Sequence, residues 1–343
     1  MTPEQWKLFR DVAQGAATET PPVALIVDSP WMPGYLGIST LDYLFDWDTW
    51  LDANLRVCRE FPEVIFLPGF WAEIGMTAEP SAFGCRVSLY PDRTPVAHRL
   101  LRDLDELDRV PQPNPLTDGY LPVLLNQYRR LEPRIRDAGH EVKIVAARGP
   151  LTTATHLMGV TEFLMALKLQ PEPVHRLLRL TTRLTREWLA AQAEALSAVE
   201  GILVLDDIPG MMSAPDYQEF AHPYLKEVFD AFPNTLKIFH NDTCNPVSYP
   251  SLPELGIHVF NFTHECPLAK ARELVGPDLC LLGNVPPLGV LAKGTPEEVT
   301  AATRECLAQH PAKRGLILSA GGGTSPGTPG ENIRALVEAA RAR

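Results

Sequence analysis

Short apolar runs recur along the chain and alternate with stretches in which apolar residues return every three or four positions. The short runs are typical of buried strands, and the longer pattern, clearest over residues 160–196, is typical of helices that pack on a sheet. Eight such runs occur, at residues 24–27, 64–67, 142–146, 202–205, 236–239, 259–262, 279–282 and 316–318. Eight strands that alternate with helices predict an α/β fold of the (β/α)8 class, the TIM barrel.

The spacing of these runs is uneven. About 75 residues separate the second run from the third, and the stretch contains Pro91, Pro95, Pro111, Pro113 and Pro115. Because proline favours turns, we expect an insertion of loops and helices over the mouth or rim of the barrel. The residues before the first run form an N-terminal extension. No stretch resembles a linker, so residues 1–343 are predicted to form one domain.

Three successive predicted strands end in acidic or imidazole side chains. Their endings are, in chain order, Asp206-Asp207, His240-Asn241-Asp242 and Thr263-His264-Glu265. The carboxyl ends of barrel strands meet at one mouth, where catalytic residues usually lie. Residues two apart on an extended backbone point to the same side, so His240 and Asp242 are suited to bind one metal ion or one polar substrate.

Each of these residues also has a structural interpretation. Asp242 is suited to cap a following helix, and His240 is suited to bond a carbonyl group in the core. The remaining residues fit a turn or a solvated loop: Asp206 and Asp207 before Pro209-Gly210, and His264 with Glu265. The pattern alone leaves both interpretations open.

Aromatic residues cluster after the first two predicted strands. They are Trp31, Tyr35, Phe70 and Trp71, with Met32 between the first two. Such side chains in loops are suited to line an apolar pocket for a methoxylated or aromatic substrate, and ordinary core packing is the alternative.

Composition excludes several classes of protein. The net charge of -11, without a long cluster of Lys or Arg, argues against a nucleic-acid surface and favours a small-molecule or protein partner. No apolar run approaches the roughly 20 residues needed to span a bilayer. The start of the chain lacks the features of a signal peptide, which predicts a cytoplasmic protein. Six cysteines without CxxC spacing argue against a disulfide framework or a zinc knuckle.

Four segments carry a resemblance to a known family. They are Arg148-Gly149-Pro150-Leu151-Thr152, Gly159-Val160-Thr161-Glu162-Phe163-Leu164, Gly283-Asn284-Val285-Pro286-Pro287 and Gly327-Thr328-Pro329-Gly330-Glu331-Asn332-Ile333. Together they resemble the uroporphyrinogen decarboxylase superfamily, which includes corrinoid-linked methyltransferases and is similar in fold to cobalamin-independent methionine synthase. The resemblance covers roughly the last 200 residues. It implies an aspartate, Asp206 or Asp207, that points into the mouth, and it makes Arg148 and Asn284 candidates for substrate binding, with a structural role as the alternative for Asn284.

The chain departs from the decarboxylases of this superfamily near the N-terminus. They have an Arg-Gln-Ala-Gly-Arg-Tyr segment that holds the carboxylates of the substrate, whereas residues 28–35 contain no arginine. A porphyrinogen with many carboxylates would lack its bidentate clamp here. Decarboxylation of uroporphyrinogen is therefore not expected.

The chain also departs from the methyltransferase branch, which binds zinc through His-x-Cys and a distant cysteine near a glycine-rich turn. His240 matches, but Asp242 replaces the first cysteine and the glycines at 321–323 replace the second. Methionine synthases of this fold add a glutamate ligand, and Glu265 lies near that spacing. The resemblance thus implies an oxygen-rich site, His240 with Asp242 and Glu265, for a divalent metal, with zinc as the expected ion.

The function that the sequence predicts is a metal-dependent methyltransferase of the O-demethylase type. It would move a methyl group from a small, methoxylated donor to a corrinoid protein or a thiol, and a homodimer is compatible with this function. One alternative is a metal-free decarboxylase or lyase that acts on a different small carboxylate. In that enzyme Asp206 or Asp207 would stabilise a cationic intermediate and His240 would relay protons. His264 is a further candidate for a catalytic residue. The other alternative is a noncatalytic protein that binds a ligand.

Overall fold

The computed structural model describes residues 1–27 and 29–342. Eight parallel strands form its centre: β1 (Val23–Ile26), β2 (Val64–Leu67), β5 (Ile144–Arg148), β6 (Gly201–Leu205), β7 (Leu236–Asn241), β8 (Val259–Phe262), β9 (Cys280–Leu282) and β10 (Leu316–Ile317). Hydrogen bonds join β10 to β5 in one six-stranded sheet, and β1 pairs with β2. A parallel bridge between Val23 and Leu318 links the two groups. Each of the eight predicted runs forms a strand, so the α/β fold with its parallel, barrel-like strand order is confirmed.

Between β2 and β5 no strand pairing occurs within residues 1–27 and 29–342. The N-terminus fills part of this gap, because the amino group of Met1 donates to the carbonyl of Glu141 at 3.0 Å. The strands therefore follow the order of a barrel without a complete ring of hydrogen bonds in the described chain.

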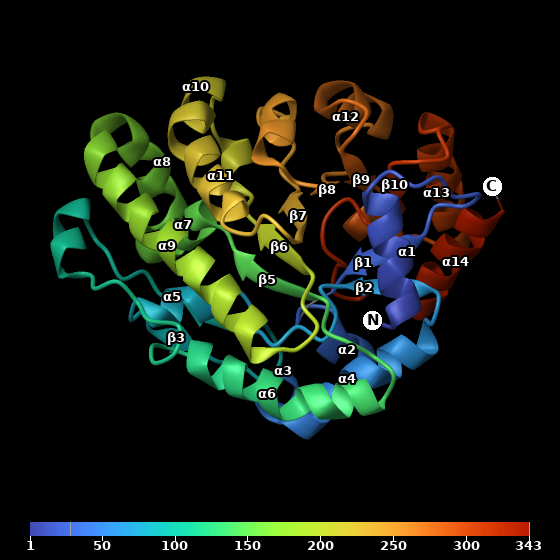
Figure 1. Ribbon diagram of the computed structural model, residues 1–343, viewed down its shortest axis with the longest axis horizontal. Coiled ribbons are helices and arrows are strands. Elements are labelled where there is room, and N and C mark those ends of the chain that lie inside the picture. Colours follow the sequence, from blue (N-terminus) through green and yellow to red (C-terminus); the bar gives the residue numbers. More distant parts are fainter. Residues whose placement is uncertain (28, 343) are drawn as a thin grey trace.

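Helices surround the strands (Figure 1). The larger ones are α1 (Pro3–Ala13), α4 (Trp47–Glu60), α6 (Leu121–Asp137), α7 (Pro150–Met158), α8 (Val160–Leu169), α9 (Pro171–Ala195), α11 (His222–Asp230), α12 (Leu268–Val275), α13 (Pro296–Gln309) and α14 (Gly330–Arg341). Shorter helical segments are α2 (Met32–Leu36), α3 (Thr40–Phe45), α5 (Ala78–Ala82), η1 (Leu104–Arg109), η2 (Ile208–Met211), α10 (Ala214–Asp216), η3 (Tyr217–Ala221), η4 (Tyr249–Leu255) and η5 (Pro287–Ala292).

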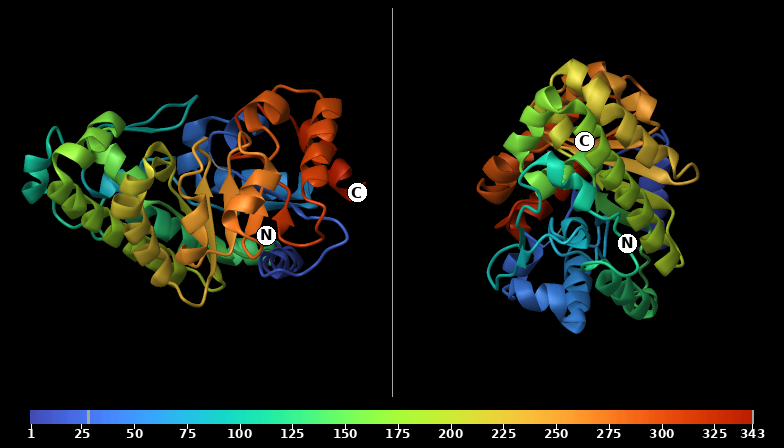
Figure 2. Two further views of the ribbon diagram at one scale, coloured as in Figure 1. Left: turned by 90° about the horizontal axis from the view of Figure 1, so that it is seen from above. Right: turned by 90° about the vertical axis from the view of Figure 1, so that its left-hand side faces the viewer.

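The predicted insertion lies between β2 and β5. It contains α5, a short antiparallel hairpin of β3 (Val87–Ser88) and β4 (Val96–Ala97), η1 and α6. Its helices contact α7 and α9 on the outside of the strands. Figure 2 shows α4 and α6 on one side of the molecule and the helices that follow β5 on the other.

The core has two parts because side chains of a strand point alternately to its two faces. The inner cluster contains every second strand residue, such as Leu203 and Leu205 of β6 and Ile238 of β7. Trp6 and Phe9 of α1 belong to the same cluster. Helix α1 therefore closes the amino end of the barrel and leaves the carboxyl ends of the strands as its mouth.

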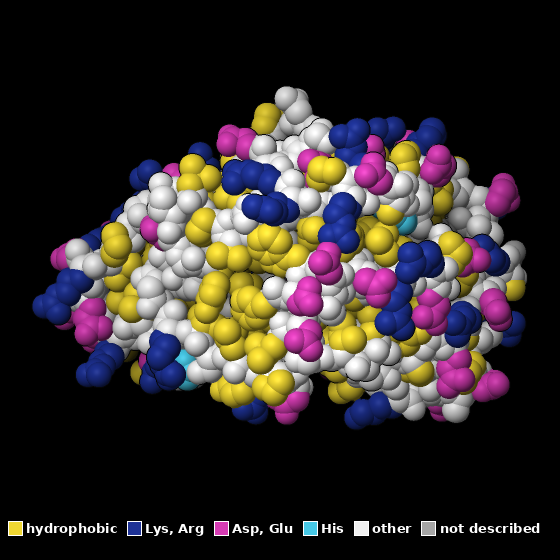
Figure 3. Space-filling view, turned by 90° about the horizontal axis from the view of Figure 1, so that it is seen from below, with side chains coloured by type: hydrophobic (Ala, Val, Ile, Leu, Met, Phe, Trp, Pro, Cys, Tyr) yellow, Lys and Arg dark blue, Asp and Glu magenta, His cyan; other side chains and the backbone are white. Residues whose placement is uncertain are grey.

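Hydrophobic side chains gather on the face that is seen from below, with a row of acidic side chains beside them (Figure 3). This is the side of α3, α4 and α6 in Figure 1. Among the described residues, no helix is both long and apolar enough to cross a membrane.

Candidate metal centre at the barrel mouth

Strand pleating separates the two neighbouring aspartates at the end of β6. Leu203 and Leu205 belong to the inner cluster, so Asp207 continues the inward side and Asp206 points outward, between strands and helices. On β7 the same alternation runs from Ile238 to His240. The mouth thus receives Asp207 and His240, but not Asp206.

Three side chains meet at the ends of β6 and β7. One ligand atom each from Asp207, His240 and Asp242 lies within 4.8 Å of the other two. The His240 Nε2 atom is 3.6 Å from the Asp207 Oδ1 atom. The backbone N–H of Asp242 donates to the same carboxylate at 3.1 Å, which fixes the Asp207 side chain against the β7 turn.

Of the three predicted metal ligands, the structure brings together His240 and Asp242. The third member of the group is Asp207, which the sequence analysis had considered for catalysis. Glu265 is exposed and lies outside this group. A ligand role for Glu265 stays a prediction.

His240 is buried and held by Asn261 of β8. The His240 Nδ1 atom lies 2.7 Å from the Asn261 Oδ1 atom. Asn261 was not predicted as a site residue, although it is the single polar residue in the buried, otherwise apolar run Val259–Phe262. Its place two residues after Val259, which belongs to the inner cluster, already indicates an inward side chain.

The electrostatics of the group suit a cation. Burial raises the pKa of the Asp242 carboxyl; His240 opposes this rise and Asp207 adds to it. Within the described chain no Lys or Arg forms an ion pair with Asp207 or Asp242. A neutral Nε2 atom and a carboxylate oxygen 3.6 Å apart are both acceptors and repel each other, unless a proton or a metal ion lies between them. One imidazole and two carboxylates are donors that divalent transition metals accept.

A glycine turn borders the group on the side of β10. A Cβ atom on Gly322 would lie 2.5 Å from the Asp242 Oδ2 atom, and one on Gly321 would lie 2.4 Å from the backbone N of His264. Only glycine permits this approach without displacement of the neighbouring chain. The resemblance placed the second family cysteine at this turn, and the structure shows that the turn indeed lies against the site.

A pocket of about 530 Å³ opens beside the group. It is lined by Gly210, Met211, Asp242, Thr243, Cys244, Thr263, His264, Glu265, Pro287 and Gly321. His264 and Glu265, both predicted site residues, thus lie on the wall of this pocket. A ligand in the pocket would reach Asp242 directly.

Asp206 lies at the beginning of α7 instead of in the pocket. Its carboxylate accepts hydrogen bonds from the backbone N–H groups of Leu151 and Thr152 and from the Thr152 hydroxyl, at 2.8 to 3.0 Å. Burial raises its pKa to about 7, although these bonds act in the opposite direction. A Cβ atom on Gly149 would lie 2.3 Å from the Asp206 Oδ2 atom, so glycine is needed there. Asp206 joins β6 to α7, a structural task that the sequence analysis had not considered.

Arg148, at the end of β5 next to β6, lies together with Trp71, which follows β2. The Arg148 guanidinium carbon is 4.9 Å from the centre of the Trp71 ring, and both residues are buried. The backbone N–H of Arg148 donates to the fully buried carboxylate of Glu79 at 2.8 Å. Burial raises the pKa of Glu79 and the Arg148 charge lowers it. Arg148 therefore balances a buried acid, and substrate binding by Arg148 or Trp71 stays a prediction.

The other predicted substrate-binding residues make internal contacts. Asn284 donates to the carbonyls of Thr263 and Cys266 at 3.2 and 2.7 Å, which holds the loop that carries His264 and Glu265. The aromatic residues pack in the core. The ring centres of Trp31 and Tyr35 are 4.7 Å apart in a stacked pair, and those of Phe70 and Trp50 are 6.2 Å apart. None of them lines the pocket beside Asp242.

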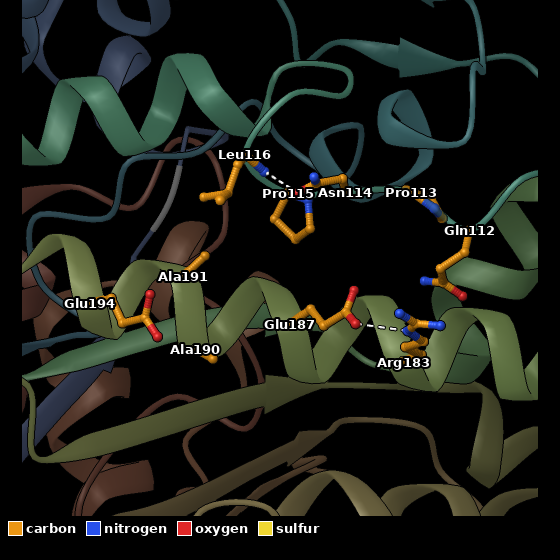
Figure 4. A pocket seen from close by; sticks show the side chains of 10 residues that line it. All are labelled: Gln112, Pro113, Asn114, Pro115, Leu116, Arg183, Glu187, Ala190, Ala191 and Glu194. Carbon is orange, nitrogen blue, oxygen red and sulfur yellow. Dashed lines mark hydrogen bonds and ion pairs between the residues drawn. The ribbon is translucent and has the colours of Figure 1, made fainter.

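A separate groove lies on the outer face of α9 (Figure 4). It is lined on one side by the loop 112–116 and on the other by residues of α9 that include Arg183 and Glu187. These two side chains form an ion pair, with 2.7 Å between the Arg183 Nε atom and the Glu187 Oε1 atom. Within the described chain, the groove contains no group of metal ligands.

Comparison with known proteins agrees with the fold. A methylated-thiol–coenzyme M methyltransferase from Methanosarcina mazei is 28% identical over 275 residues, which cover 78% of this chain and 71% of the relative. A uroporphyrinogen decarboxylase from Thermus thermophilus is 27% identical over 312 residues, which cover 83% of this chain and 87% of the relative. The solved structure of a methyltransferase from Methanosarcina mazei has a TM-score of 0.83 at 20% identity and covers 98% of both chains, which shows a shared fold.

The family match extends beyond the segments that carried the resemblance. Residues 5–343 match the family described as Uroporphyrinogen decarboxylase (URO-D). This match includes the N-terminal third, where the sequence analysis found only a departure from the decarboxylases. The chain therefore belongs to the uroporphyrinogen decarboxylase (URO-D) family.

Proposed function

We propose that this protein is a metal-dependent methyltransferase whose metal ion is held by Asp207, His240 and Asp242. The observation that carries the proposal is the convergence of their ligand atoms within 4.8 Å at the barrel mouth, beside an open pocket. The methyltransferase relative from Methanosarcina mazei supports the same class of reaction. Zinc is the metal that the resemblance implies.

A divalent ion bound there would act as a Lewis acid, which polarises the methyl-bearing atom of a donor or lowers the pKa of an acceptor thiol. Residues of the chain would orient the metal ligands and shape the space around them. Asn261 holds the His240 ring, and the Asp242 backbone N–H holds the Asp207 carboxylate. The Gly321–Gly322 turn leaves room beside Asp242 and His264. His264 lies on the pocket wall, where an exposed imidazole is available to accept or donate a proton.

The proposed metal ligands favour activation of the methyl donor over activation of the acceptor thiol. Carboxylate oxygens leave a metal ion more electrophilic than thiolates do, because they donate less charge to it. We therefore propose activation of a small methyl donor, methoxylated or methylated on sulfur, with a corrinoid protein or a thiol as acceptor. The Methanosarcina mazei relative is a methylated-thiol–coenzyme M methyltransferase, which supports a methylated thiol as one such donor.

Metal content and turnover of His240→Ala test the proposal. The wild type purified without added metal is expected to contain about one divalent ion per chain, measured by elemental analysis. His240→Ala removes the nitrogen ligand, so metal content and methyl transfer should fall together. His98→Ala, which changes a histidine on the β3–β4 hairpin next to Ser88, is the control and should keep both.

Two results would overturn the metal assignment. One is a His240→Ala protein with full metal occupancy and activity. The other is a wild type that turns over without metal while His240→Ala does not, which would favour the metal-free lyase.

A further inference from the structure

Asn261 makes contacts that go beyond its bond to His240. Its Nδ2 atom donates to the carbonyl of Leu282 at 2.8 Å and to the carbonyl of Ala320 at 3.1 Å. The residue is fully buried, and its side chain therefore joins β7, β9 and the segment after β10 to β8. We infer that Asn261 is the positioning residue of the metal site, which presets the tautomer of His240 before any ion binds.

The orientation of the Asn261 amide follows from its partners. A carbonyl oxygen accepts hydrogen bonds and cannot donate, so the two carbonyls of Leu282 and Ala320 require the NH2 group on their side. The Oδ1 atom must then face His240. The reverse orientation would place an oxygen against two carbonyl oxygens inside the protein, which would leave buried acceptors unpaired.

The tautomer of His240 follows in turn. Since the Asn261 Oδ1 atom is an acceptor, the His240 Nδ1 atom must carry the hydrogen and donate it across the 2.7 Å contact. In a neutral ring the lone pair is then on Nε2, the atom that faces the Asp207 carboxylate at 3.6 Å. A metal ion needs this lone pair, because only an unprotonated ring nitrogen coordinates.

The bond to Ala320 extends the effect to the other side of the group. Ala320 directly precedes the glycine turn whose Gly322 approaches the Asp242 carboxylate. One amide therefore fixes both the ring of His240 and the turn that borders Asp242. This inference rests on the proposed function for its metal, but the tautomer itself is a property of the metal-free protein.

The first experiment compares two buried asparagines with the same structural task. Asn332 of α14 is also fully buried and donates to two carbonyls, Leu291 at 2.9 Å and Gly294 at 2.8 Å, but it lies outside the metal group. Asn261→Leu and Asn332→Leu should lower the melting temperature to a similar degree. Only Asn261→Leu should weaken zinc binding, by about 10- to 100-fold in competition with a chelator, because ligand-orienting contacts contribute about that much.

Equal zinc affinity of the wild type and Asn261→Leu would overturn the inference. Equal weakening in both variants would do the same, because it would show a general effect of lost stability. The Asn261→Asp variant adds a check, since it keeps an acceptor for the His240 Nδ1 hydrogen. It should retain more zinc affinity than Asn261→Leu.

The second experiment reads the tautomer directly and does not depend on metal binding. Metal-free wild type labelled with 15N in its histidines is measured at a pH where the imidazoles are neutral, and His240→Ala identifies the His240 signals. A hydrogen on Nδ1 and none on Nε2 would support the inference. A hydrogen on Nε2 would overturn it, even if Asn261→Leu does not fold. A wild type with the expected tautomer but no affinity for zinc would contradict the proposed function alone.

Discussion

Two parts of the barrel mouth differ in how their charged side chains are arranged. At β5, burial raises the pKa of the Glu79 carboxyl, and the buried Arg148, which packs on Trp71, opposes this rise. At β6 and β7, Asp207 and Asp242 surround His240, and no ion pair with Lys or Arg compensates them among the described residues. Removal of one of two opposite charges inside a protein is costly, whereas acids grouped beside an imidazole favour the binding of a proton or a cation.

This contrast separates stability from metal binding. Substitutions on the β5 side should change the free energy of unfolding, and substitutions on the β6–β7 side should change the affinity for metal. A β5-side variant that changes only metal affinity, or a β6–β7-side variant that changes only the free energy of unfolding, would contradict this comparison.

The largest effect on stability is expected for Arg148→Leu. It leaves the Glu79 carboxylate buried without its nearby positive charge, which should cost about 3 to 5 kcal/mol at pH 8. Urea unfolding of the metal-free protein measures this change. Arg99→Leu, which breaks the exposed pair of Arg99 with Glu162, is the control and should cost about 1 kcal/mol or less. An Arg148→Leu protein as stable as the control would show that the β5 side is not held by compensated charge.

The next effect is expected on metal affinity for Asp207→Ala. The change removes one carboxylate ligand, so the affinity for zinc should fall about 100-fold, which corresponds to about 2.7 kcal/mol. Glu265→Ala removes a carboxylate from the wall of the same pocket but not from the ligand group, and its effect should be at most a few-fold. Competition with a chelator measures both. A larger loss for Glu265→Ala would favour the ligand set that the resemblance had implied.

A smaller effect on stability is expected for Asp206→Asn. The amide NH2 group cannot accept the bonds that α7 donates, so one buried N–H group loses its partner at a cost of about 2 kcal/mol. The affinity for zinc should change by less than a few-fold, although the neighbouring Asp207 is a proposed ligand. A loss of metal without a loss of stability would show that Asp206 belongs to the site.

The difference between these neighbouring aspartates shows how far the sequence reaches. The eight apolar runs predicted the eight parallel strands but not the short hairpin of β3 and β4, and the polar strand endings indicated the end of the barrel where the candidate site lies. Residue type could not distinguish Asp206 from Asp207, because the distinction depends on which one continues the inward side of β6. The alternation was present in the sequence, but the side that faces inward became clear only from the packing of Leu203 and Leu205 in the inner cluster.

Other features depend on contacts between distant segments, which a single sequence does not show. Asn261 reaches Ala320, 59 residues later. Glu265 lies near the family spacing, but its exposed loop carries it to the pocket wall. Arg148 has the type and position of a substrate-binding residue, yet its nearby acid Glu79 lies in the insertion, 69 residues earlier. Spacing along the chain predicted the neighbourhood of the site, and tertiary contacts decided its members.

The smallest effect is expected for His156→Gln on the β5 side, and it appears as a change in pH dependence. Burial, with a further contribution from Arg148, lowers the pKa of His156 from 6.5 to about 4. The folded protein thus binds fewer protons than the unfolded chain between these values, so the stability that neutral His156 provides is lost as the pH falls from 6.5 to about 4. Between pH 7.5 and pH 5.5 the wild type should lose about 1 kcal/mol more than His156→Gln, as measured by urea unfolding at both values. His140, whose pKa is also lowered to about 4, contributes equally to both proteins. Identical pH slopes would contradict the neutral state of the half-buried His156, whereas the expected difference, together with unchanged zinc affinity, would place this pH sensitivity on the β5 side, away from the proposed metal ligands.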